Sequence, residues 1–255
     1  MHASIWALML FTLLVQAGVG SFLLTPVTSK REIRFVSLVL TAAGTGISFF
    51  HLGNPSKAYF ALTNLKSSWL SREILFALIF LALLTLLLLA DRRKGFPSTL
   101  GRILELLTGL AGIALIFCMS KLYMLATVPA WNSPATPVSF FLTAFLLGTQ
   151  IAALSSGRHI PRLRRLSLLS LLLLVSQISV LLFSAHLTLK GLVLARLILA
   201  ASAAVCLILL VRQTKKSGAA WKDLRPFAVA SFSLILCSEL LGRYLFYAAY
   251  LRLGL

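Results

Sequence analysis

The sequence predicts an all-α fold, a polytopic membrane helical bundle of eight transmembrane helices, and three observations support this prediction. Of the 255 residues, 59% are hydrophobic and 12% are charged, and the mean hydropathy of +0.96 lies far above that of soluble globular domains. The apolar residues form runs of about 20, the length a helix needs to cross a hydrocarbon core of about 30 Å. Basic residues cluster between alternate runs.

Each predicted helix corresponds to one apolar run. The runs cover residues 4–25, 34–52, 73–91, 102–125, 137–155, 166–187, 191–211 and 227–250. No Lys or Arg precedes the first run, and no small-residue cleavage site with a polar segment behind it follows, so we expect a retained helix and not a signal peptide. Without a repeat or a long Pro- or Gly-rich linker, residues 1–255 are expected to form a single integral membrane domain.

The charge of the connections predicts the topology. Most of the 24 Lys and Arg residues follow the first, third, fifth and seventh runs, while the sequence has only 6 Asp and Glu residues. By the positive-inside rule these connections face the cytoplasm, and both termini lie on the outer, periplasmic side of a bacterial cytoplasmic (inner) membrane. Because the basic residues occur in short clusters between apolar runs, the net charge of +18 does not indicate a nucleic-acid partner.

Ionisable residues within or at the ends of membrane helices are costly, which makes them candidates for function. Under the predicted topology they all lie toward the outer side, and we therefore expect one site. The candidates are His51, Arg72, Glu73, Lys121, Tyr123, His186, Glu239 and Arg243.

His51 and Glu73 flank a polar outer stretch, residues 51–73. Together they supply an imidazole and a carboxylate that can accept protons from a bound pair of hydroxyl groups. Each also has a structural interpretation, because a His can reach the headgroups from a helix end and a Glu after Ser71 suits a first helical turn.

Glu239 and Arg243 are four residues apart, so they share a helix face and can form a neutral pair, which is an alternative to contacting a ligand. Trp69 and Trp131 fit either an interfacial aromatic belt or a pocket for a flat ring. Gln16, Gln150 and Gln177 are isolated in the sequence.

Two other classes of protein remain open alternatives. His51 and His186 could ligate a haem in a b-type cytochrome, although they lack the spaced-pair arrangement usual for a haem in a helical bundle, and we expect no haem. A transporter or purely structural anchor would need polar residues near the bilayer midplane or interrupted helices, and the sequence offers little of either.

Three segments carry a resemblance to a known family: HLGNPSKAYFALTNLKSSWLSREI (51–74), YMLATVPAWNSPATPVSFFLT (123–143) and ELLGRYLFY (239–247). They resemble the membrane-anchor subunit of the bacterial dimethyl sulfoxide reductase family. The resemblance implies an anchor in anaerobic respiration that binds menaquinol, has no haem, and passes electrons to the [4Fe–4S] clusters of an iron–sulfur subunit beside a molybdopterin catalytic subunit.

The resemblance also implies the site residues. His51 and Glu73 would bind the quinol, and motif position and membrane side add Arg72, Tyr123, Trp131, Glu239 and Arg243. The residues alone also indicate that a partner protein is needed. Quinol oxidation needs an electron acceptor nearby, and the three scattered cysteines, Cys118, Cys206 and Cys237, cannot hold a cluster. We therefore expect a partner subunit to dock on the outer loops. The sequence does not distinguish the terminal electron acceptor.

Overall fold

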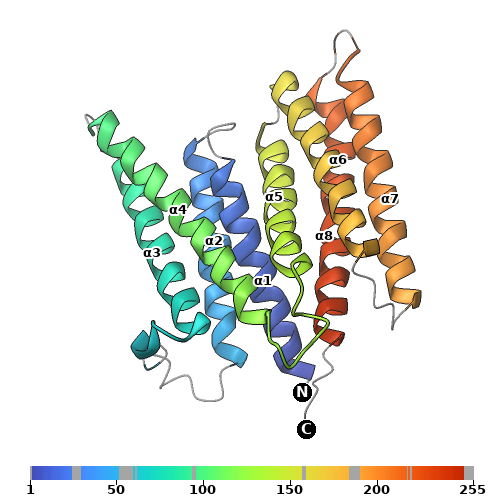
Figure 1. The fold of residues 1–255 in the computed structure, drawn as a ribbon. Coiled ribbons are helices and arrows are strands. Elements are labelled where there is room, and N and C mark those ends of the chain that lie inside the picture. Colours follow the sequence, from blue (N-terminus) through green and yellow to red (C-terminus); the bar gives the residue numbers. More distant parts are fainter. Residues whose placement is uncertain are drawn as a thin grey trace.

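A computed structural model describes residues 2–24, 30–51, 60, 62–93, 96–156, 159–183, 190–216, 218 and 220–249. These residues form α-helices joined by short connections, without a strand among them (Figure 1). In chain order the elements are α1 (His2–Leu23), α2 (Lys30–Ser48), η2 (Phe49–His51), α3 (Trp69–Ala90), α4 (Ser98–Tyr123), α5 (Ala135–Ser156), α6 (Ile160–Phe183), α7 (Lys190–Gln213) and α8 (Trp221–Ala248).

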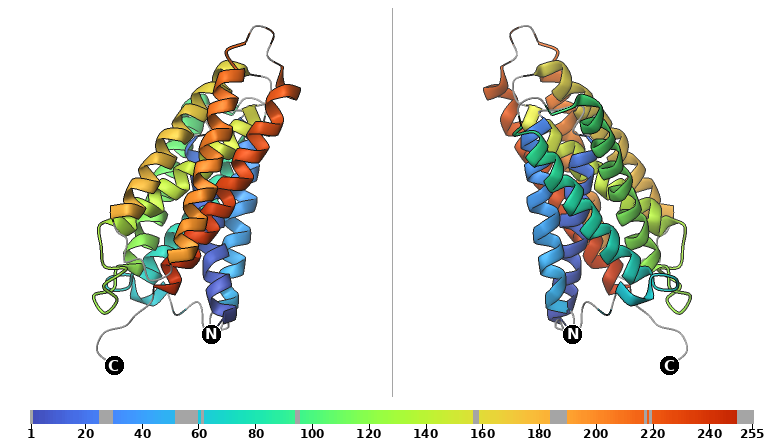
Figure 2. Two further views of the ribbon diagram at one scale, coloured as in Figure 1. Left: turned by 90° about the vertical axis from the view of Figure 1, so that its right-hand side faces the viewer. Right: turned by 90° about the vertical axis from the view of Figure 1, so that its left-hand side faces the viewer.

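The helices run side by side along one common direction, and both views of Figure 2 show the same elongated bundle. α1 packs against α2, α4, α5 and α8, while α3 and α4 form one flank and α6 and α7 the other (Figure 1). α1 begins and α8 ends at the same end of the bundle, which we call the first end. The predicted order of eight helices is confirmed for the part of the sequence that the structure describes. Which end faces the periplasm stays a prediction.

Seven of these helices are long and apolar enough to cross a membrane, and α2 is the exception. α2 opens with the charged sequence KREIR and then carries the polar residues Ser37 and Thr41. Both side chains are fully buried, and the Ser37 hydroxyl donates a hydrogen bond of 2.7 Å to the carbonyl oxygen of Gly18 in α1. α2 is therefore held in the bundle partly by polar contacts, and the eighth span stays a prediction.

α1 and α5 approach each other at their backbones. A Cβ atom added to Gly148 of α5 would collide with the backbone of Gly20 in α1, and one added to Gly20 would collide with the backbone of Ala144. The absence of side chains at these two glycines lets the helix axes come close, a common device in membrane helix pairs. This contact joins the two flanks of the bundle.

α3 begins at Trp69, four residues before the predicted start. Ser68 caps the helix, since its hydroxyl accepts a hydrogen bond of 3.2 Å from the backbone N–H of Ser71. Glu73 consequently lies inside the helix and not at its first residue. At the opposite, second end of the bundle, buried Arg34 of α2 pairs with Asp91 (2.7 Å) and Glu105 (3.2 Å) and so joins α2, α3 and α4.

Candidate functional site

Glu73 carries a buried carboxylate and lies in the half of α3 that is nearer the first end of the bundle. Only 2% of the residue is exposed, and neither carboxylate oxygen has a hydrogen-bond partner among the residues that the structure describes. Buried polar groups in proteins almost always have partners, and an unpaired one costs about 1–3 kcal/mol. The Glu73 carboxylate is therefore available to accept a hydrogen bond from a bound group.

A pair of tyrosines lies near this carboxylate. The Tyr247 hydroxyl of α8 donates a hydrogen bond of 2.8 Å to the Tyr123 hydroxyl at the end of α4, and both residues are buried. Glu73 is close enough to interact electrostatically with both phenols. The pair links α4 with α8.

An aromatic cluster encloses the tyrosines. The Trp131 ring stacks on Phe246 at 5.2 Å and 11°, and its Nε1–H donates to the Phe246 carbonyl oxygen at 2.7 Å. The Tyr123 ring meets Trp131 and Phe246 in edge-to-face contacts at 5.7 Å each. Trp131 is thus buried and does not belong to an exposed interfacial belt.

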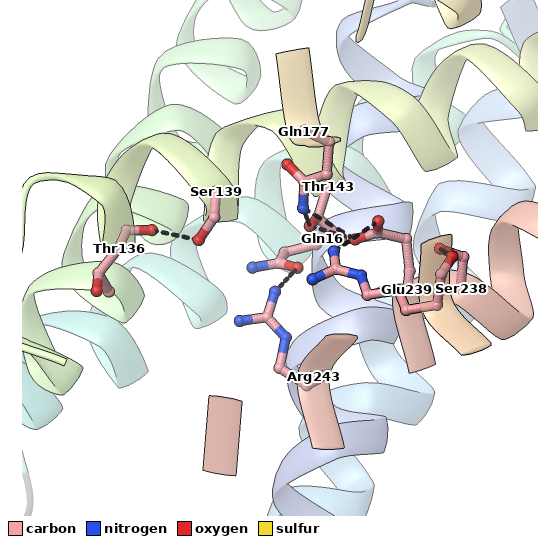
Figure 3. Close-up of polar contacts among 9 residues, drawn as sticks. Gln16, Thr136, Ser139, Thr143, Gln177, Ser238, Glu239 and Arg243 are labelled. Carbon is pink, nitrogen blue, oxygen red and sulfur yellow. Dashed lines mark hydrogen bonds and ion pairs between the residues drawn. The ribbon is translucent and has the colours of Figure 1, made fainter. Parts of the chain in front are cut away.

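Glu239 of α8, a second buried glutamate with 3% exposure, has several partners (Figure 3). Its Oε2 accepts hydrogen bonds from the Thr143 hydroxyl of α5 (2.6 Å) and from Gln177 Nε2 of α6 (3.4 Å). Its Oε1 pairs with Arg196 Nη2 of α7 at 3.4 Å. Four helices are joined through this one carboxylate.

The pair of Glu239 with Arg243 that the spacing allows is not the contact that either residue makes in the structure. The Arg243 Nη2 donates instead to Gln16 Oε1 of α1 at 2.7 Å (Figure 3), and its guanidinium lies 4.0 Å from the centre of the Phe140 ring. Although four residues of spacing put both side chains on one helix face, α8 packs against both α1 and α7, and each charge finds its partner on a different neighbour.

A cavity of about 800 Å³ lies among α5, α6, α7, α8 and the connection between α4 and α5, near the first end of the bundle. Its polar lining residues include Thr136, Ser139, Thr143, Gln177, Arg196, Glu239 and Arg243. Apolar residues, among them Leu181, Val193 and Leu245, line much of the rest. We call this space the α5–α8 cavity.

The structure therefore divides the predicted site residues. Trp131, Glu239 and Arg243 line the α5–α8 cavity, while Tyr123 contacts Trp131 and lies within electrostatic reach of Glu73. Arg72 has a local role, because its guanidinium donates to the carbonyl oxygens of Leu65 and Lys66 (2.9 and 2.7 Å) and lies over Trp69.

Two histidines of the predicted site are not located by the structure. The side chain of His51, whose backbone ends η2, lies outside the described residues, as does the whole of His186. Among the described residues, no group of three or more His, Cys, Asp or Glu side chains could hold a metal ion.

The sequence analysis did not identify several of the residues that bind Glu239 and Arg243. Arg196 lies within an apolar run, and a charge in such a position is itself a signal of function or pairing. Gln16 and Gln177 are not isolated, because they bind Arg243 and Glu239. Thr143 could not be identified from the sequence, since placing a threonine inside a membrane helix costs little free energy and is therefore not evidence of function.

The fold and site define a multi-pass helical membrane protein with buried polar groups near one end of the bundle. A family model described as DMSO reductase anchor subunit (DmsC) matches residues 1–191, and the protein belongs to this family. The resemblance seen in the three sequence segments is thus confirmed.

Individual relatives have matching names. The sequence is 31% identical to a subunit of the anaerobic dimethyl sulfoxide reductase of Haemophilus influenzae, over 57% of this protein and 56% of the relative. It is 29% identical to a subunit of the anaerobic dimethyl sulfoxide reductase of Escherichia coli, over 98% and 96%. A sulfite dehydrogenase subunit of Allochromatium vinosum is 31% identical over 48% and 41%. The match thus spans little more than half of the first relative and nearly all of the second.

Proposed function

We propose that this protein is the membrane anchor of a molybdenum oxidoreductase complex in a bacterial inner membrane, and that it oxidises menaquinol near the first end of the bundle. Membership of the anchor-subunit family and seven apolar helices support the anchoring role. The names of the relatives, a dimethyl sulfoxide reductase and a sulfite dehydrogenase, support a redox complex without fixing its terminal acceptor.

The observation that carries the quinol proposal is the unpaired carboxylate of Glu73. A quinol hydroxyl is the kind of group that would complete it, since the hydroxyl donates a hydrogen bond and then gives up its proton. The tyrosine pair and the surrounding aromatic cluster, near Glu73, offer an apolar environment for the quinol ring. His51, at the end of η2, is the proposed acceptor for the second proton.

The reaction balances with a partner as the oxidant. Menaquinol loses two protons and two electrons and becomes menaquinone, and the protons leave through Glu73 and His51 toward the outer side. The two electrons pass one at a time to a [4Fe–4S] cluster in an iron–sulfur subunit, and from there to a molybdopterin catalytic subunit. The three cysteines of this protein lie on three different helices, with Cys118 buried, Cys206 half-buried and Cys237 exposed, so they do not form a set that could bind a cluster.

The partner surface is proposed to be the first end of the bundle. The connection between α4 and α5 folds into consecutive turns, with Val128 and Trp131 buried and neighbouring residues exposed. Such an ordered loop, anchored by its own buried side chains, provides a preformed surface for docking.

The proposal is tested with the purified complex and a soluble menaquinol analogue, by following reduction of the iron–sulfur clusters. We expect Glu73→Gln to slow reduction by about 100-fold or more, because general acid–base groups contribute about 10²–10⁴-fold. Glu32→Gln is the matched control, since Glu32 is exposed at the second end of the bundle. Undiminished reduction in an assembled Glu73→Gln complex would exclude Glu73 from the quinol site.

A reduced-minus-oxidised absorbance spectrum of the same sample tests the cytochrome alternative. A haem band that disappears in His51→Ala or His186→Ala would show that these residues bind iron, and the quinol assignment of His51 would then be abandoned. We expect no such band.

A further inference from the structure

The α5–α8 cavity has an excess of positive charge. Among its described lining residues, the charged ones are Arg196, Glu239 and Arg243, with exposures of 9%, 3% and 5%. The lining thus carries two guanidinium groups and a single carboxylate. An uncompensated charge at membrane depth is costly, and the favourable solution is a counter-ion of the opposite sign.

Both arginines have unused hydrogen-bond donors. A guanidinium carries five N–H groups, yet among the described residues Arg196 donates one side-chain hydrogen bond, to Glu239, and Arg243 donates one, to Gln16. None of their nitrogen atoms is both fully buried and without a partner in the described part of the protein. The remaining N–H groups therefore open onto accessible space, which at this position is the cavity.

Packing holds the two cations together. The guanidinium of Arg196 lies against Gly242, where a Cβ atom would collide with it, and Gly242 directly precedes Arg243 in α8. Arg243 is fixed on its other side by the faces of Phe140 and Phe246, at 4.0 and 5.7 Å. The two guanidinium groups are close enough to repel each other electrostatically, so a bound anion would relieve a repulsion that the packing imposes.

The rest of the cavity is largely apolar. Leu181 of α6, Val193 of α7 and Leu245 of α8 line it, and α6 and α7 form the flank of the bundle opposite α3 and α4 (Figure 1). A ligand that fits this lining has an anionic head and an apolar body. In a membrane, the abundant molecules of this kind are phospholipids.

We propose that the α5–α8 cavity binds an anionic phospholipid, with Arg196 and Arg243 donating hydrogen bonds to its phosphate oxygens and the acyl chains following the apolar lining. One phosphodiester group carries one negative charge, which would neutralise the excess of one positive charge. Glu239 is then a positioning residue that keeps Arg196 in place. This site adjoins the proposed quinol site, because Trp131 and Phe246 of the aromatic cluster line the cavity, but neither Glu73 nor Tyr123 does.

The test is native mass spectrometry of the full-length protein in detergent with added phosphatidylglycerol. We expect one phosphatidylglycerol molecule to be retained after collisional activation, at least tenfold more than phosphatidylcholine, and Arg243→Gln to abolish the difference. The matched control is Arg164→Gln, an exposed arginine at the second end of the bundle, which should retain the lipid. Equal loss in both variants would overturn the proposal, since it would indicate general attraction to a basic protein.

A second variant guards against misfolding of Arg243→Gln. Ser139 lines the cavity from α5 and is not charged, so Ser139→Trp fills the space while leaving both arginines in place. We expect this variant to lose the retained lipid. If the Ser139→Trp variant still retains phosphatidylglycerol, the lipid does not bind in the α5–α8 cavity and the proposal is overturned.

Two competitors separate the possible sources of the ligand. Inorganic phosphate that displaces the lipid at millimolar concentration would overturn the lipid assignment in favour of a free anion. Displacement by a menaquinone analogue would instead assign the cavity to the quinol. If the proposed quinol site fails in the Glu73→Gln experiment while one phosphatidylglycerol is still retained, only the quinol proposal is lost.

Discussion

Two buried glutamates near the same end of the bundle have opposite surroundings. Glu239 receives hydrogen bonds from Thr143 and Gln177 and pairs with Arg196, whereas Glu73 has no partner among the described residues. Their exposures, 3% and 2%, are almost equal. Burial alone therefore does not distinguish the paired carboxylate of Glu239 from the unpaired one that we propose to react, and the hydrogen-bond partners do.

Because their partners differ, we expect the loss of the Glu239 carboxylate and the loss of the Glu73 carboxylate to have different effects on stability. A buried charge with partners stabilises the packing of the helices that contribute those partners. Its removal leaves a partner's charge buried in a low-dielectric environment without a counter-ion. An unpartnered charge destabilises the fold, and proteins retain such groups where they serve a function.

The largest expected effect is the loss of stability in Glu239→Ala. The substitution leaves Arg196 without its ion-pair partner beside a second buried guanidinium, and removing one member of a buried pair costs about 3–5 kcal/mol. Chemical unfolding in detergent, followed by circular dichroism, measures the change. A variant as stable as the parent protein would show that Arg196 is neutralised by another group.

Thr143→Val tests the same network more gently. Its hydroxyl makes the shortest hydrogen bond to Glu239, at 2.6 Å, and valine is close in shape but lacks a hydroxyl to donate. A hydrogen bond to a charged group contributes about 2 kcal/mol, and we expect a loss of that size in the same unfolding assay. Thr85→Val, in an exposed position of α3, is the control and should change stability little.

Glu73→Met is expected to act in the opposite direction. Methionine is similar in length and apolar, so it removes an unpaired buried polar group and should raise the free energy of unfolding by about 1 kcal/mol. Quinol-driven cluster reduction should be lost in the same variant. Destabilisation by Glu73→Met would mean that the carboxylate has a structural partner and that the contrast with Glu239 is false.

The smallest expected effect on stability is that of Tyr247→Phe. The variant removes the 2.8 Å hydrogen bond to Tyr123 but keeps the ring contacts, so the cost should be below about 1 kcal/mol. If the tyrosine pair belongs to the Glu73 site, turnover with menaquinol should fall by more than this small loss explains. Unchanged turnover would limit the tyrosines to packing.

The helix order could be predicted from the sequence because it depends on the length of apolar runs, which bilayer thickness fixes. The start of α3 could not be predicted as well, because the cap at Ser68 lies outside the apolar run, and hydropathy does not detect it. The position of several site residues near one end of the bundle could also be predicted, because successive spans cross the membrane in alternating directions. These residues are Glu73, Tyr123, Trp131, Glu239 and Arg243.

The pairing within the site could not be predicted in the same way. Membrane helices are apolar on nearly all sides, so the sequence carries little periodicity to show which face meets which neighbour. Whether Glu239 meets Arg243 or Arg196 depends on how α8 packs against α1 and α7, and small residues such as Gly242 make the close approach possible. The separation of Glu73 from the α5–α8 cavity is likewise a result of packing.

The polar character of α2 has a consequence for the biogenesis of the protein. α2 opens with Lys30 and Arg31, buries Ser37 and Thr41, and is less apolar than the seven helices that could cross a membrane. A less apolar segment gains less free energy on entering lipid. Its hydrogen bond to Gly18 is available only when α1 is already beside it. We therefore expect α2 to enter the bilayer together with α1, as a helical hairpin.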